Sequence, residues 1–230
     1  MTTFVLIHGG GDVGWSWHLV RQELESRGHH VIAPDLPADD DALTLDDYAA
    51  AVVNAVDARE DVVVVGHSFG GFTAPLVAER LSADVLVLLA GMIPAPGESP
   101  DQWWANTGYE HAVREQAALD DGLTGNEDPL VSFYHDVPRR LAADALSRER
   151  AHPSSAAMAA VWPALAWPSV PTRVLIGTED RFFPAGFMRR VAEERLGIVP
   201  DEIDGSHCVM LSRPVEVAER LIGYSSAARA

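Results

Sequence analysis

The sequence predicts an α/β protein with a doubly wound, mostly parallel sheet and a helical cap inserted after the fourth strand. Short apolar runs of strand length alternate with segments whose apolar residues recur at three- and four-residue steps. Several of the runs are almost continuously apolar, as in strands that are covered by helices on both faces. This alternation is typical of a parallel sheet. With 230 residues, 47% of them hydrophobic, the chain can build one well-buried core but is short for two.

The expected elements follow one another in a regular order. Six apolar runs are candidate strands: residues 3–8, 30–35, 61–67, 84–90, 172–177 and 199–204. Five segments between and after them have helical periodicity: residues 15–28, 45–58, 72–82, 185–197 and 214–224.

One long segment interrupts the alternation. Residues 92–167 contain no strand candidate, although prolines and four of the six tryptophans gather there. The segment is too long for an ordinary loop, so we interpret it as a helical cap. The predicted core then consists of residues 1–91 and 168–230, with the cap inserted between them.

Composition restricts the classes of function. The net charge is −17 and no basic cluster occurs, which argues against nucleic acid and anionic membrane surfaces as partners. Cys208 is the only cysteine, so an intramolecular disulfide and the cysteine-based zinc patterns are excluded. The N-terminus has neither the cationic flank nor the apolar length of a signal peptide. We therefore expect a cytoplasmic protein without a metal, and a homodimer remains open.

A candidate nucleophile follows the third expected strand. Residues 66–70 read Gly-His-Ser-Phe-Gly, a G-x-S-x-G motif placed between a strand and a helix. In that context the serine lies on a strained turn and projects its hydroxyl above the carboxyl edge of the sheet, where open parallel sheets bind ligands. The five letters alone could occur by chance, but the flanking elements favour Ser68 as a nucleophile. We expect His67 to have a structural role within the turn.

A serine nucleophile requires a base and a group that orients the base. For this motif the chain order is serine, acid, histidine. Asp180 follows the fifth expected strand, and His207 lies just past the sixth. Glu179 is an alternative acid, but the position nearer the Arg-Phe-Phe-Pro turn is favoured. We therefore assign Ser68, Asp180 and His207 as catalytic residues.

Attack on a carbonyl places negative charge on its oxygen, which needs hydrogen-bond donors. The first expected strand ends in His8 and three glycines, a loop whose backbone N–H groups can approach a substrate closely. We assign one donor to Gly10 and the other to Phe69, the residue after the nucleophile. A phosphate-binding turn is the alternative reading, but neither G-x-G-x-x-G nor the P-loop pattern is present.

These features together resemble the α/β-hydrolase superfamily over nearly the whole chain. The stretches "LIHGGGDVGWSWHLV", "GHSFGG", "GTEDRFFP" and "GSHCVMLSRPVEVAERL" are similar to the small methylesterase and hydroxynitrile lyase branch and its bacterial relatives. The resemblance implies a compact core, a helical cap over the serine and no cofactor. Related dehalogenases and epoxide hydrolases have an aspartate at the elbow, where this chain has Ser68.

The resemblance also implies a serine esterase acting on a small ester through an acyl-enzyme intermediate. The alternatives are a hydroxynitrile lyase or another C–C bond-cleaving lyase, a thioesterase or a lactonase. The lyases of this branch have a lysine directly after the catalytic histidine and a threonine after the first-strand histidine, where this chain has Cys208 and Gly9. Six large apolar residues are candidates for the substrate pocket: Trp103, Trp104, Phe133, Met158, Trp162 and Met210.

Overall fold

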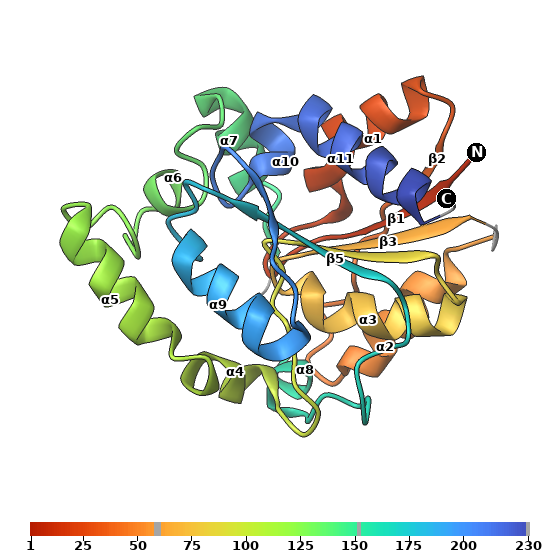
Figure 1. The fold of residues 1–230 in the computed structure, drawn as a ribbon, viewed down its shortest axis with the longest axis horizontal. Coiled ribbons are helices and arrows are strands. Elements are labelled where there is room, and N and C mark those ends of the chain that lie inside the picture. The colour runs from red at the N-terminus through yellow and green to blue at the C-terminus, as the bar shows by residue number, and fades with distance from the viewer. Residues whose placement is uncertain (58–60, 151–152, 229–230) are drawn as a thin grey trace.

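The fold is a single parallel sheet between two layers of helices (Figure 1). The computed structural model describes residues 1–57, 61–150 and 153–228. Six strands pair in the order β2-β1-β3-β4-β5-β6, and every pair is parallel. Their bounds are β1 Thr3–Ile7, β2 His30–Ile32, β3 Val62–His67, β4 Val85–Leu89, β5 Thr172–Gly177 and β6 Asp201–Ile203. The predicted doubly wound sheet is confirmed.

Helices cover both faces of this sheet, and each face has its own apolar cluster. Helices α1 (His18–Ser26), α10 (Val209–Ser212) and α11 (Pro214–Ala227) pack on one face. Helices α2 (Leu45–Asn54), α3 (Gly70–Leu81) and α9 (Ala185–Leu196) pack on the other. Since both faces are covered, the central strands β1, β3 and β4 are buried along their whole length, which explains their continuous apolar sequence.

The ends of the elements differ from the predictions by a few residues. The second strand stops at Ile32 instead of residue 35, since Pro34 has no N–H to donate to a ladder. A 3-10 turn, η1 (Gly14–Trp17), precedes α1, and α3 begins two residues earlier than predicted. Helix α2 ends at Asn54, and the predicted end at residue 58 lies outside the described residues.

The segment between β4 and β5 consists of short helices joined by turns. They are α4 (Pro100–Asn106), α5 (Tyr109–Leu119), α6 (Pro129–Ser132), α7 (Arg139–Leu146) and α8 (Ser155–Ala159). Within its described residues, 92–150 and 153–167, the segment has no strand. Figure 1 shows α4 to α6 (green) beside α9, away from β2 and the chain termini. The secondary structure in the described part of the segment is helical, as its amphipathic pieces predict.

Aromatic packing, a buried hydrogen bond and ion pairs attach this segment to the core. Trp103 packs against Phe183 and Phe187, and its Nε1–H donates to the carbonyl of Ile93, near the start of the segment, at 3.0 Å. The Nε1–H of Trp162 donates to the carbonyl of Phe72 in the core at 3.0 Å. Arg195 on α9 donates to Glu98 at 2.8 Å. Burial alone would raise the pKa of Glu98, but hydrogen bonds from Arg195 and Asn106 outweigh it and hold the pKa below its usual value. Glu98 is therefore charged at neutral pH, as the ion pair requires.

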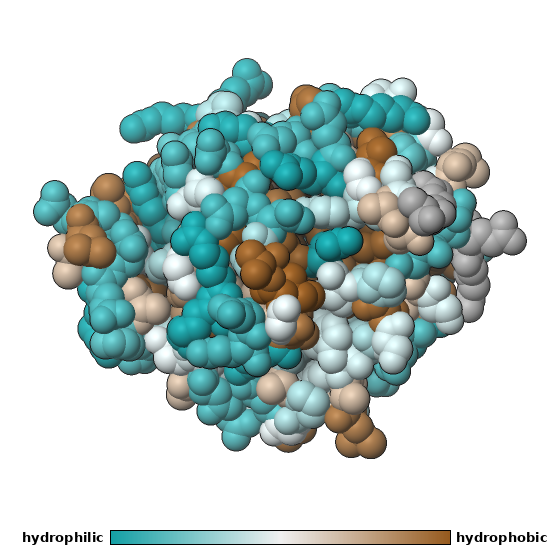
Figure 2. Space-filling view, in the orientation of Figure 1, coloured by the Kyte–Doolittle hydropathy of each residue, from teal (hydrophilic) through white to brown (hydrophobic). Residues whose placement is uncertain are grey.

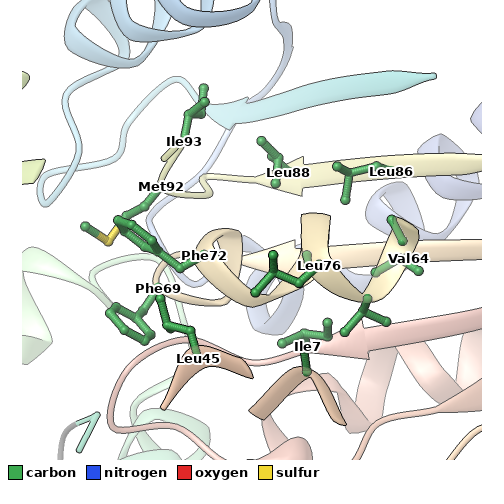
Figure 3. Close-up of a cluster of buried hydrophobic side chains, with 14 of the residues drawn as sticks. Ile7, Leu45, Val64, Phe69, Phe72, Leu76, Leu86, Leu88, Met92 and Ile93 are labelled. Atoms are coloured by element: carbon green, nitrogen blue, oxygen red, sulfur yellow. The ribbon is translucent and has the colours of Figure 1, made fainter. Parts of the chain in front are cut away.

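One apolar cluster leads directly to the carboxyl edge of the sheet. Figure 3 shows Val64 and Ile7 beneath α3, with Phe69 and Met92 at the end of the cluster. The surface of the molecule is mostly hydrophilic in the view of Figure 2, with smaller hydrophobic groups near the middle of that face. The apolar side chains are thus concentrated in the two clusters.

Replacement of Trp103 by alanine should lower the free energy of unfolding by about 3–5 kcal/mol, because it removes a fully buried aromatic side chain and its hydrogen bond. Trp104→Ala is the matched control on the same helix and should cost clearly less, because Trp104 is only partly buried. Urea unfolding of both variants measures the difference. Equal losses would contradict this account of how the segment is anchored.

Candidate active site

Ser68 occupies a tight turn between β3 and α3. Its φ of 49° lies in the left-handed region, which is unusual for a residue other than glycine. A Cβ on Gly66 would lie 2.6 Å from the Cβ of Ala74, and one on Gly70 would lie 2.7 Å from the carbonyl oxygen of His8. The two glycines of the motif are therefore required by close approach. The turn presents Ser68 at the carboxyl edge of the sheet.

Asp180 and His207 are joined by a short, buried hydrogen bond. The Nδ1–H of His207 donates to Oδ2 of Asp180 at 2.7 Å. The other carboxylate oxygen accepts the N–H groups of Phe182 and Phe183, each at 2.8 Å. These bonds fix Asp180 at the turn after β5, whereas Glu179 is exposed. Of the two acids considered from the sequence, Asp180 is the one that contacts the histidine.

His67 is tied to the backbone of His207. Its Nε2–H donates to the carbonyl oxygen of His207 at 3.0 Å, since a carbonyl can only accept. Nδ1 therefore keeps its lone pair and has no hydrogen-bond partner among the described residues. Burial, together with the neighbouring His207, holds the pKa of His67 well below its usual value. His67 is thus a neutral side chain that links β3 to the loop after β6.

The glycine loop after β1 is held by His8. The Nδ1–H of His8 donates to the carbonyl of Gly9 at 2.8 Å, and its Nε2 accepts the N–H of Leu36 at 2.9 Å. In the part of the chain that the structure describes, the N–H groups of Gly10 and Phe69 have no acceptor. Both residues line one cavity together with Ser68. Two backbone donors are thus available beside the serine.

Two cavities meet at Ser68 and Gly10. The first, of about 330 Å³, is mostly apolar and is lined by Gly10, Ser68, Phe69, Met92, Trp104, Phe133, Pro153, Met158 and Phe182. The second, of about 400 Å³, has a mixed lining with several charged side chains, and we name it the polar cavity. It is lined by Gly9, Gly10, Gly11, Asp12, His67, Ser68, Glu127, Pro129, Phe133, Tyr134, Glu149, Arg150, His207 and Cys208. Ser68 therefore faces one apolar and one polar compartment.

Comparison with known proteins assigns the chain to a family. The sequence matches the alpha/beta hydrolase family over residues 4–220, nearly the whole chain. The chain belongs to the alpha/beta hydrolase family. The resemblance predicted from the sequence is confirmed, and this hydrolase is an enzyme by its family.

Its relatives include plant enzymes of similar length. Norfluorocurarine synthase 1 from Strychnos nux-vomica is 28% identical, over 95% of this chain and 93% of the relative. Polyneuridine aldehyde esterase from Rauvolfia serpentina is 29% identical, over 96% and 95% of the two chains. A crystal structure of polyneuridine aldehyde esterase superposes with a TM-score of 0.78 at 26% identity and covers 98% of this chain and 99% of its own. Salicylic acid-binding protein 2 from Nicotiana tabacum is 29% identical over 95% of each chain. These relatives support ester hydrolysis in general.

The structure separates the six residues that were predicted to line a pocket. Trp104, Phe133 and Met158 lie on the wall of the apolar cavity. Trp103 and Trp162 are instead fully buried, with their indole N–H groups bonded to backbone carbonyls. Met210 is also fully buried, in the cluster beneath α1 and α11. None of these three lines either cavity, and packing against the core accounts for their burial.

Several residues at the site were not predicted from the sequence. Phe182 lies in the same turn as Asp180, so the sequence could have indicated that it lies at the site. Asp12 directly follows the glycine loop, and this position could likewise have indicated a carboxylate at the site. Tyr134 and Glu149 come from the inserted segment and carry no local signal. Burial raises the pKa of Asp12 to about 7. The nearby His207 acts to lower this pKa, and Glu149 acts to raise it.

Among the described residues, no group of three or more histidine, cysteine, aspartate or glutamate side chains is arranged to hold a metal ion. A membrane-spanning helix is also absent from those parts of the chain, since none of the helices there has the required length and apolar character.

The close packing of the turn predicts that alanine substitutions at two glycines have opposite effects on the free energy of unfolding. Gly66→Ala should lower the free energy of unfolding by about 1–3 kcal/mol, because the new methyl group overlaps Ala74 and Gly70. Gly223→Ala, in the middle of α11 with nothing within 4 Å of the added carbon, should raise it by up to about 1 kcal/mol. Thermal or urea unfolding compares the two. An unchanged free energy of unfolding in Gly66→Ala would show that the turn has room for a methyl group.

Proposed function

We propose that this hydrolase cleaves a small carboxylic ester through an acyl-enzyme intermediate on Ser68, with His207 as base and Asp180 as its orienting partner. The observation that carries the proposal is the 2.7 Å hydrogen bond from His207 to buried Asp180, in a histidine that lines the same cavity as Ser68. The names of the relatives, which include esterases, support it as well.

In the proposed mechanism His207 accepts the proton of the Ser68 hydroxyl while the serine oxygen bonds to the ester carbonyl carbon. The N–H groups of Gly10 and Phe69 then stabilise the oxyanion. Collapse of the tetrahedral intermediate breaks the bond to the alcohol oxygen, which takes the proton from His207. Water deprotonated by His207 then attacks the acyl-enzyme. When the second tetrahedral intermediate collapses, the Ser68 oxygen leaves the acyl carbon and takes the proton back from His207, and the acid is released.

Asp180 holds His207 in the tautomer that leaves Nε2 unprotonated toward the serine. Its carboxylate also stabilises the imidazolium formed during each step. Since neutral His67 lies beside His207, it adds no positive charge that would oppose this protonation. We further propose that residues 92–167 act as the cap, because Trp104, Phe133 and Met158 of this segment line the apolar cavity.

The residues beside the triad favour an esterase over a cyanohydrin lyase. At the position after His207, Cys208 offers no positive charge for a departing cyanide, and burial raises the pKa of its thiol well above the usual value. At Gly9, a Cβ would lie only 3.1 Å from both Nδ1 of His67 and the Cβ of Ser68. A threonine there would require His67 and Ser68 to shift by a few tenths of an ångström. The proposed triad also suits thioesters and lactones, which remain alternative substrates.

Ser68→Ala should reduce hydrolysis of a short activated ester by about 10⁴-fold or more, because the members of a triad act as a unit. The loss should occur without a change in folding, since the hydroxyl is replaced by hydrogen. Initial rates with p-nitrophenyl butyrate and circular dichroism provide the two readouts. Substantial turnover by a pure, folded variant would refute the assignment of the nucleophile.

The wild-type enzyme should cleave an aryl ester but should not release cyanide from an aromatic cyanohydrin faster than buffer does. Both substrates are supplied in parallel at the same pH, and cyanide is measured directly. Cyanide release well above the uncatalysed rate without ester cleavage would favour the lyase alternative instead.

A further inference from the structure

The two cavities at Ser68 are chemically different, and the proposed mechanism assigns one half of the ester to each. The departing alcohol oxygen must receive its proton from His207, which lines only the polar cavity. The oxyanion donor Phe69 lines only the apolar cavity. The acyl chain therefore extends into the apolar cavity and the alcohol half into the polar one. This step rests on the proposed function.

The described lining of the polar cavity is rich in negative charge. Three carboxylates, Asp12, Glu127 and Glu149, contribute to it. The one arginine there, Arg150, is already paired, since its guanidinium lies 3.1 Å from a carboxylate oxygen of Asp35 and 3.3 Å from one of Asp39. Its charge is thus largely neutralised by groups outside the cavity. An anionic alcohol would meet net repulsion here.

A second feature of this cavity also suits a cation. Oδ2 of Asp12 lies 3.8 Å from Nδ1 of His67, which is buried and has no hydrogen-bond partner among the residues described, so the carboxylate has no cationic partner in that histidine. The rings of Phe133 and Tyr134, which also line the cavity, are surfaces on which an alkylammonium group can pack.

We propose that the preferred substrates are esters of an apolar carboxylic acid with a small alcohol that carries an ammonium group, and that Asp12 is the main specificity-determining residue for that group. Asp12 is suited to this role because it lies on the glycine loop itself and its side chain is only 14% exposed. A charge-assisted interaction in such a setting is stronger than one on the open surface.

The proposal makes the preference for a cation dependent on pH. Burial raises the pKa of Asp12 to about 7, so the side chain is mostly neutral at pH 6 and mostly charged at pH 8. The attraction for an ammonium group should therefore increase as the pH rises. The titratable and charged groups that surround Asp12 are His67 on β3, His207 and Cys208 after β6, Tyr134 after α6, Glu127 before α6, and Glu149 and Arg150 after α7.

The test compares three butyrate esters whose alcohol halves have similar size. They are butyrylcholine, which is cationic, 3,3-dimethylbutyl butyrate, which is its neutral isostere, and the anionic ester of 2-hydroxyethanesulfonate. Release of butyrate gives kcat/KM for each ester at pH 6 and pH 8. The ratio of the cationic to the neutral ester cancels every effect of pH on the catalytic steps that the two substrates share. We expect a ratio of about ten or more at pH 8, a smaller one at pH 6, and the lowest kcat/KM for the anionic ester.

Substitutions then assign the preference to a residue. Asp12→Asn should reduce the ratio at pH 8 several-fold and remove its dependence on pH, and Glu149→Gln should reduce it less. Glu110→Gln, on the exposed surface of α5, is the matched control and should leave the ratio unchanged. If Asp12→Asn does not fold, the pH dependence of the wild-type ratio and the Glu149→Gln variant still test the proposal.

The outcomes distinguish this inference from the proposed function. A wild-type ratio near or below one, or a preference that Asp12→Asn and pH both leave unaltered, would overturn the inference while cleavage of the neutral ester still supported an esterase. Failure to cleave any of the three esters and p-nitrophenyl butyrate would overturn the proposed function, and the inference with it.

Discussion

The conformation of Ser68 is the constraint on which the rest of the site depends. A left-handed backbone at a non-glycine residue costs about 1–3 kcal/mol, so the surroundings must hold it. Its carbonyl accepts the N–H groups of Gly71 and Met92, at 3.0 and 2.9 Å, and its own N–H donates to the carbonyl of Leu89. The turn is thus bonded to the start of α3 and to the chain at the end of β4. The central strands hold the nucleophile rigidly because they are paired on both sides.

The same strand also positions the base. His67, one residue before the nucleophile, binds the backbone carbonyl of His207, which comes from a loop 140 residues later in the chain. The serine and the histidine are therefore linked through His67. Asp180 is fixed separately, by the two N–H groups of its own turn. Burial keeps His67 neutral, so this link places no positive charge beside His207.

The sequence predicted the sheet and the serine, acid and histidine positions because these depend on local patterns at the ends of strands. The walls of the site depend on tertiary packing and were predicted only in part. Trp103 and Trp104 are neighbours on α4, and adjacent helical residues point in different directions, so one packs in the core and the other faces the cavity. Composition alone cannot choose between them. The polar cavity was missed for a similar reason, since its lining comes from the glycine loop, the inserted segment and the loop after β6.

The attachment of the inserted segment has a consequence for how such enzymes diversify. Trp162 and Glu98 bond to the core near the two ends of the segment, whereas Phe133, Tyr134 and Glu149 line the cavities from its interior. Most anchoring and lining residues are therefore different, although Arg150 both lines the polar cavity and pairs with Asp35 and Asp39 of the core. Mutations in the interior can alter the walls while the anchors keep the segment in place. The substrate range can thus change through substitutions in this stretch while the protein stays folded.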